Sequence, residues 1–227
     1  YESSVAFFRD ANAPQGGDDA LAAYVTTLVR LAWFYVLRND PRARTVLDSA
    51  DALLTERKVA PDVQGMLEQT WGEYWRRAGE LDRAIGSKHR ALLIFERIGD
   101  KRSILITHLN LISLYWEAKS YDRAIESAAH IQSAAREGPV EPAILASTHI
   151  NLGAVYLWKG DAQRAIGENE RALDVSLRAN LRLQANRAHF NLAEAFYKRF
   201  AADHDPKAEQ RADAHIAAML GAPSSEI

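Results

Sequence analysis

The sequence contains no cysteine, almost no net charge and no long uninterrupted apolar run, and each of these absences excludes a class of protein. Without cysteine there is no disulfide framework and no thiolate chemistry. A formal net charge of −2 provides no basic field, so we expect no direct binding to nucleic acid. The longest apolar stretch, Leu31 to Leu37, is far too short to span a bilayer, so we expect no membrane association. These features favour a cytoplasmic protein.

Signatures of catalysis and of cofactor binding are also missing. The sequence has no Gly-rich phosphate loop, no nucleophile elbow and no HExxH metal pair. We therefore expect that the chain is not an enzyme and that it binds no cofactor and no metal. The triplet Asp203-His204-Asp205 resembles a metal-binding group, but Asp205 directly precedes Pro206 and is expected to cap a helix instead.

What the sequence does contain is a repeat. Trp71-Gly72, Leu111-Ile112, Leu152-Gly153 and Leu192-Ala193 follow one another at intervals of 40, 41 and 40 residues. A second landmark, Arg-Ala-Ile beginning at residues 83, 123 and 164, keeps the same intervals. Two landmarks in step indicate one structural unit copied along the chain, and a unit of two short helices must stack on its neighbours to bury its apolar face.

The apolar periodicity and the turn residues predict an all-α chain of five helix pairs. The expected helices cover about 18–38, 41–58, 62–78, 81–98, 101–118, 121–136, 142–159, 162–179, 182–200 and 206–220. We interpret residues 1–18 as a linker or the end of a preceding element, 19–221 as the repeat domain and 222–227 as a tail. Because the chain begins at Tyr1, we interpret it as the C-terminal piece of a longer protein.

The pattern resembles the tetratricopeptide repeat (TPR), which places Leu-Gly, Tyr, Gly, Ala and Ala at fixed offsets in a helix–turn–helix. The matching residues of the fourth repeat are Leu152-Gly153, Tyr156, Gly160, Ala165 and Ala172. The resemblance implies a right-handed α-solenoid of about five repeats, whose period of about 40 exceeds the usual 34. The run from Ala91 to Arg102 is similar to the TPR regions of bacterial MalT-like and peptide-sensing transcription regulators.

By this resemblance the first helices line a concave groove that binds a peptide or protein segment. One column of groove positions recurs once per repeat: Arg30, Thr70, Asn110, Asn151 and Asn191. Each of the three asparagines stands immediately before the Leu of the buried stripe. An Asn side chain carries a donor and an acceptor and can hold a peptide backbone. The alternative interpretation is that these amides are solvated or bonded to a neighbouring helix.

Larger side chains flank this column. The expected binding residues among them are Leu109, Ile150 and Phe190 on one side, then Trp116, Trp158 and Tyr197 about two turns later, with Arg76 and Arg187 as cations. Exposed, they form an apolar floor with aromatic walls. The alternative interpretation is that they seal contacts between adjacent repeats, which the pattern favours for Leu157 and Trp158.

A histidine column, His108, His149 and His189, precedes the three asparagines by two residues. These side chains are one repeat apart, too far for one metal ion, whose ligands all lie within about 2.1 Å of it. We expect packing histidines that bond a neighbouring helix.

The sequence thus predicts a non-catalytic, peptide-binding regulatory module of a larger bacterial signalling or transcription-regulating protein. The alternative is a structural scaffold or a homodimerisation module. For that alternative the last helix would supply the apolar side formed by Ala208, Ala212, Ile216, Met219 and Leu220.

Overall fold

The computed structural model describes residues 2–3, 5–6, 17–56 and 60–220, and these residues form ten long helices and no strand. The helices are α2 (Asp18–Leu37), α3 (Arg42–Glu56), α4 (Pro61–Arg77), α5 (Leu81–Ile98), α6 (Lys101–Glu117), α7 (Tyr121–Glu137), α8 (Pro142–Trp158), α9 (Ala162–Arg178), α10 (Arg182–Asp203) and α11 (Pro206–Met219). The all-α prediction is confirmed, and most ends agree within one or two residues. The predicted end near Lys58, the tail 222–227 and most of the linker lie outside the described residues.

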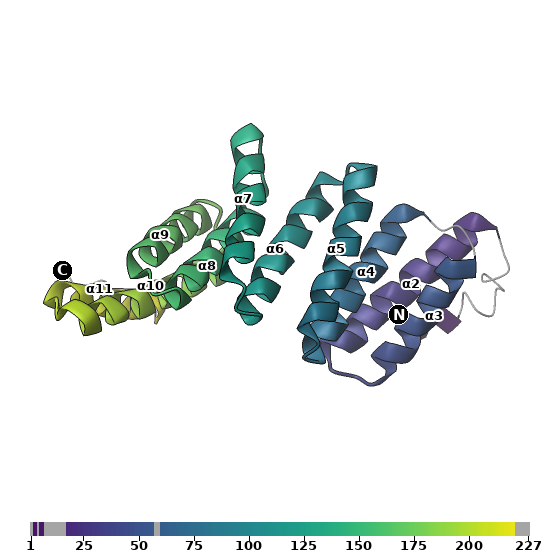
Figure 1. Cartoon of the computed structure of the whole chain (residues 1–227), viewed down its shortest axis with the longest axis horizontal. Helices are drawn as coiled ribbons and strands as arrows, with labels where there is room; N and C mark the ends of the chain where they lie inside the picture. Colours follow the sequence, from purple (N-terminus) through teal and green to yellow (C-terminus); the bar gives the residue numbers. More distant parts are fainter. Residues whose placement is uncertain (1, 4, 7–16, 57–59, 221–227) are drawn as a thin grey trace. The chain divides into compact units, whose positions relative to one another are not determined.

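The chain divides into two compact units, Tyr1–Thr107 and His108–Ile227, with the boundary inside α6. In the first unit α2 packs on α3 and on α4, and α4 packs on α5. In the second unit α8 packs on α9, α10 packs on α8, α9 and α11, and α7 packs on α8 (Figure 1). Consecutive helices therefore form antiparallel pairs, and each pair rests on the next within its unit.

The turns between paired helices share a left-handed residue. Asn39, Gly79, Lys119 and Gly160, spaced 40, 40 and 41 residues apart, all have φ between 53° and 81°. In each turn the next backbone N–H closes onto a carbonyl of the last helical turn, as in Asp161 N to Tyr156 O at 2.9 Å. Glycine adopts this conformation without strain, which explains its presence at two of the four positions.

The repeated Arg-Ala-Ile motif is explained by its contacts. Ala84, Ala124 and Ala165 are all 0% exposed, at the point where the second helix of a pair needs a small side chain. The arginine before each alanine lies over the aromatic ring eight residues earlier. The guanidinium-to-centroid distances are 3.4 Å for Arg83 over Trp75, 5.9 Å for Arg123 over Tyr115 and 5.6 Å for Arg164 over Tyr156. Each such cation–π contact contributes about 0.5–2 kcal/mol.

Helix α2 is a longer apolar segment than the uninterrupted run Leu31–Leu37. Over Asp19–Leu37 its length and mean hydropathy of 1.6 would allow it to cross a membrane. Half of that window is buried inside the protein. Leu21, Val25 and Ala32 are 0% exposed, and the helix packs on α3 and α4. In the structure α2 is a core helix of the first unit.

Two helical glycines make room for a large side chain of the partner helix. A Cβ on Gly153 would lie 2.0 Å from Asn169 Nδ2, and a Cβ on Gly72 would lie 2.8 Å from Lys88 Cε. Both partners stand sixteen residues after their glycine. The immediate neighbour of Gly153 is the buried Asn169 side chain, which donates to Ala165 O at 2.8 Å.

We expect Gly153→Ala to destabilise the second unit by about 1–3 kcal/mol, because the added methyl collides with a side chain that is itself fully packed. Adding Asn169→Ala should recover part of this loss by opening the space. Urea unfolding followed by circular dichroism measures both effects. Gly167→Ala is the matched control, since a Cβ there meets nothing within 4 Å; it should stabilise helix α9 by up to about 1 kcal/mol. Equal effects of the two glycine substitutions would contradict the packing argument.

Candidate functional site

The predicted asparagine row of the second unit is bonded to the preceding helix. Asn151 Nδ2 on α8 donates to Ser113 Oγ on α6 at 3.1 Å, and Asn191 Nδ2 on α10 donates to Ile150 O on α8 at 3.3 Å. Both side chains, like Asn110, are half-buried. The alternative of amides bonded to a neighbouring helix is therefore correct for Asn151 and Asn191. Each of these hydrogen bonds uses the amide nitrogen of the asparagine. The carbonyl oxygen of the same side chain is a further hydrogen-bond acceptor.

Trp158 is the large aromatic side chain that the structure leaves most open. It is 60% exposed at the end of α8, whereas its neighbour Leu157 is 5% exposed and belongs to the core between α8 and α10. The ring of Trp116 on α6 meets it edge-on with centroids 6.2 Å apart, and Lys198 Nζ on α10 lies 5.5 Å from its centroid. The interpretation as a contact between adjacent repeats is confirmed for Leu157. Trp158 also contacts both adjacent repeats, but its ring stays 60% exposed.

A depression of about 590 Å³ is lined by Leu157, the residue that precedes Trp158 in the sequence. Its lining residues come from the α8–α9 turn and from the C-terminal part of α10: Leu157, Gly160, Ala162, Gln163, Lys198, Arg199, Ala202 and Asp203. Lys198 therefore contacts Trp158 and also lines the depression. Arg199 is held within it by Gln163 Oε1 at 3.4 Å and by Asp205 at 3.9 Å. Nothing in the sequence indicated this depression, because the residues of its two walls are about forty positions apart in the sequence.

The flanking residues divide by their place in the array. Phe190 is 57% and Tyr197 38% exposed, while Ile150, at the equivalent position of the preceding repeat, is 2% exposed. Leu109 is half-buried, and Arg187 is exposed. The prediction that Ile150 presents an accessible side chain was wrong, because α10 and α9 cover it through Ala188 and Ala172.

The first unit holds the other three predicted binding residues. Arg30 is exposed. Thr70 is 3% exposed and its hydroxyl donates to Met66 O at 2.9 Å, so the prediction of an accessible side chain was wrong there too. Arg76 donates to both carboxylate oxygens of Glu73, at 2.7 and 2.9 Å, and Arg77 also bonds this group. Burial alone would raise the pKa of Glu73, but these two arginines outweigh it and lower the pKa.

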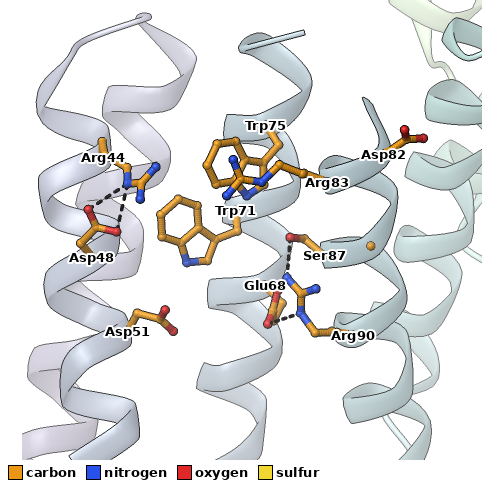
Figure 2. A pocket seen from close by; sticks show the side chains of 11 residues that line it. Arg44, Asp48, Asp51, Glu68, Trp71, Trp75, Asp82, Arg83, Ser87 and Arg90 are labelled. Atoms are coloured by element: carbon orange, nitrogen blue, oxygen red, sulfur yellow. Dashed lines mark hydrogen bonds and ion pairs between the residues drawn. The ribbon is translucent and has the colours of Figure 1, made fainter. Parts of the chain in front are cut away.

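A cavity of about 520 Å³ in the first unit was not anticipated. Figure 2 shows its floor, Trp71 and Trp75 on α4, between walls contributed by α3 and α5. The two indoles are stacked with centroids 5.3 Å apart. Arg44 lies 5.2 and 5.3 Å from the two rings and Arg83 lies over Trp75, so the chain's own guanidinium groups already cover the aromatic floor.

The charges of this cavity are mixed and mostly paired within its own walls. Arg44 Nε donates to Asp48 at 2.8 Å, and Arg90 donates to Glu68 at 2.7 and 2.9 Å. Such an arrangement clamps α3, α4 and α5 together and offers no concentrated field of one sign. Trp71 and Trp75 were recognised in the sequence as repeat landmarks, but nothing there indicated which arginines would lie over them.

The buried Lys88 is a third feature that the sequence alone did not indicate. Lys88 is 2% exposed and donates to Gln69 O at 2.8 Å and to Gln69 Oε1 at 2.5 Å; Gln69 in turn donates to Thr107 Oγ1 at 2.5 Å. Burial lowers the pKa of Lys88 to about 8. A glycine in the preceding helix, sixteen residues earlier, was the available signal. The network ties α5 to α4 and α4 to α6 inside the first unit.

The three histidines pack within their own helix pairs, as expected. His108 stacks on His130 with centroids 4.3 Å apart, and His149 Nδ1 lies 2.6 Å from the buried Glu168 Oε2. His189 Nδ1 lies 3.0 Å from His215 Nδ1. Within the described ranges no group of three His, Cys, Asp or Glu side chains is placed to hold a metal ion. Asp205 accepts a hydrogen bond from Lys207 N at 3.0 Å and caps α11.

The last helix contributes less open surface than its sequence suggested. Ala208 and Ala212 are 2% and 0% exposed, because they pack in the core against α10. Ile216 is 37% and Leu220 78% exposed. The apolar side of α11 is thus largely covered by its own repeat.

The His189–His215 contact predicts a pH dependence of stability. Burial, then the charges of His189 and Arg211, lower the pKa of His215 from 6.5 to about 4. Burial also lowers the pKa of His189. Because the folded pKa lies below the unfolded one, the unfolded chain binds more protons between these values. The stability of the second unit is therefore complete above about pH 6.5 and decreases as the pH falls towards 4.

Urea unfolding between pH 5 and pH 7 measures this slope. His215→Gln should flatten it, whereas substitution of the exposed His89 in the first unit by Gln should leave it unchanged. An unchanged slope in His215→Gln would show that other groups carry the proton linkage.

Comparison with known proteins gives matches to solved structures alone. No protein-family model and no curated protein sequence matches the chain. The crystal structure of BtubC (BKLC) from P. vanneervenii is 23% identical, with a TM-score of 0.73 over 100% of this chain and 92% of that one. The TPR-like repeats of a putative kinesin light chain from Podosopora anserina are 15% identical, with a TM-score of 0.65 over 85% and 94% of the two chains.

A third similar structure is a signal transduction ATPase with numerous domains (STAND) and a tetratricopeptide repeat sensor, from Pyrococcus horikoshii. It is 15% identical, with a TM-score of 0.61 over 96% of this chain and 40% of that one. At these identities the likeness concerns the fold. It agrees with the helix pairs, the left-handed turns and the arginine–aromatic contacts described above. The chain is a helical-repeat protein with the tetratricopeptide-repeat fold.

Proposed function

We propose that the second unit binds a peptide or protein segment on the face formed by its first helices, at Trp158. The observation that carries this proposal is the 60% exposure of a tryptophan held between Trp116 and Lys198. Burying an exposed indole removes a large apolar area from water, and tryptophan is enriched among residues that dominate binding energy.

Trp158 departs from its own column, which supports a role beyond packing. The equivalent residues of the second, third and fifth repeats are the charged Arg77, Glu117 and Lys198, and the first repeat has Leu37. No other repeat has an aromatic residue at this position, so the repeat fold does not need an indole there. The exposed ring therefore serves a contact that the chain does not make with itself.

The groups around Trp158 fit an extended ligand with an apolar side chain. Asn151 lies two helical turns before it on α8, and Asn191 lies on the adjacent α10. The carbonyl oxygens of these amides can accept N–H groups of a peptide backbone. Lys198 lines the depression next to the indole and can receive an acidic group of the ligand. Leu109 and Asn110 remain further candidates of this site. Arg30 and Arg76 lie in the first unit and remain separate candidates there.

The module belongs, in this proposal, to a larger signalling or transcription-regulating protein and acts as its sensor or interaction part. The TPR sensor of the similar STAND protein supports this placement. The sequence of the module carries none of the catalytic signatures considered above, and the module is built of stacked repeats. Both features fit a binding role in which small changes in the angle between neighbouring repeats are passed along the array.

Selection of peptides from a displayed random library on the immobilised full chain, followed by titration of one labelled winner, tests the proposal. Trp158→Ala should weaken binding at least about tenfold, because truncation of a central aromatic anchor typically costs about 2 kcal/mol. Asn151→Ala and Asn191→Ala should weaken it less.

The matched control is Trp33→Ala. Trp33 lies on α2 in the first unit and is 41% exposed. The substitution therefore removes an exposed indole from a different helix. Equal losses for Trp33→Ala and Trp158→Ala, or no loss for either, would contradict the assignment. Circular dichroism checks that both variants keep the fold.

A further inference from the structure

An apolar stripe on α10 lies open at the last repeat. Leu183, Phe190 and Tyr197 are 70%, 57% and 38% exposed. They are spaced seven residues apart, so they fall along one edge of the helix over a length of about 21 Å. This stripe is distinct from the column of Asn191 and Lys198, which lies closer to α8.

The preceding repeat shows what such a stripe is for. The equivalent residues of α8, forty positions earlier, are Ala143, Ile150 and Leu157. Ile150 is 2% and Leu157 5% exposed, because α10 packs over them together with α9. A helix laid against the α8 stripe therefore buries it. Within the described residues no helix buries Leu183 or Phe190 of α10 in this way, while the Tyr197 hydroxyl donates to Asp213 on α11 and its ring stays 38% exposed. The surface is shaped for one more apolar helix edge.

We infer that the stripe pairs with the same stripe of a second copy of this chain, α10 against α10 in antiparallel orientation. The spacing supports a copy of itself because the stripe is symmetric about Phe190. A two-fold axis at this residue places Phe190 on its counterpart and Leu183 on Tyr197 of the other copy.

The charges that flank the stripe complement each other in this arrangement. Arg187 stands three residues before Phe190 and Glu194 four residues after it, on the same side of the helix. A two-fold axis at Phe190 brings Arg187 of one copy beside Glu194 of the other, with an axial offset of about 1.5 Å. The symmetry makes two such pairs, at the positions where paired helices form interhelical salt bridges.

The rearrangement of charge needed for this pairing is small. Glu194 is bound to Lys198 of its own helix at 3.6 Å, and both side chains are nearly half exposed. An exposed pair of this kind contributes about 0–1 kcal/mol, so Glu194 can exchange or share its partner at little cost.

The absence of cysteine allows a direct test on the full chain. A single cysteine from Phe190→Cys should form an intermolecular disulfide under mild oxidation, because the residue meets itself at the two-fold axis. Non-reducing electrophoresis measures the rate. Leu177→Cys on α9, where the side chain is 64% exposed and is not part of the stripe, is the control and should cross-link at least about tenfold more slowly.

Charge reversal tests the orientation. Sedimentation velocity over a range of concentrations should show a dimer of the unmodified chain. Arg187→Glu and Glu194→Arg should each weaken it at least about tenfold by bringing like charges together, and the double variant should restore it. Trp158→Ala should leave the dimer intact, which separates this inference from the proposed peptide site.

Three outcomes would overturn the inference. The first is that the unmodified chain stays a monomer at every concentration at which it is soluble. The second is that Phe190→Cys cross-links no faster than Leu177→Cys. The third is that the double charge reversal fails to restore a dimer that the single reversals break.

Discussion

The structure depends on one constraint: a helix pair of this length cannot bury its own apolar edge and needs the next pair to cover it. Ile150 and Leu157 on α8 are almost inaccessible because α10 lies on them. The same column on α10, through Phe190 and Tyr197, stays open because no further pair follows within the described residues. Burial in this fold is therefore a property of the position of a repeat in the array as much as of its sequence.

This constraint explains how much of the fold the sequence could predict. The period, the helix ends and the left-handed turns depend on local chemistry, which is written in each repeat. Gly79 and Gly160 mark two of the turns directly, and Asp205 before Pro206 marks the start of α11. The Arg-Ala-Ile motif also recurs because its contact is local in the array: the arginine reaches a ring only eight residues away.

Contacts between helices were harder to predict, because they depend on which side chains meet across a gap of sixteen to forty residues. The pairing of Gly153 with Asn169 and of Gly72 with Lys88 follows a constant offset. That offset becomes visible only when the close approach is known. The amides of Asn151 and Asn191 looked equivalent, yet one bonds a side chain and the other a backbone carbonyl of the neighbouring helix.

The residues of the candidate site stay a prediction, and the structure shows only which of their side chains are accessible. Reading a column across repeats assumes that equivalent positions do equivalent work, and one column shows that they do not. Gln69 joins a buried hydrogen-bond network, Ile150 fills the core, and Phe190 faces outward. Where the residues of a column differ this much in burial and contacts, their shared position in the repeat says little about function.

The informative positions are instead those at which a repeat departs from what the array requires. Trp158 is such a departure, since charged side chains occupy the same position in the neighbouring repeats and satisfy the fold there. Phe190 is the opposite case. It is apolar like Ile150 at the equivalent position of the preceding repeat, but no following helix packs over it within the described residues. The two side chains therefore support the two proposals for different reasons. The indole at Trp158 is not needed by the repeat fold, and the phenyl ring of Phe190 is left unburied by it.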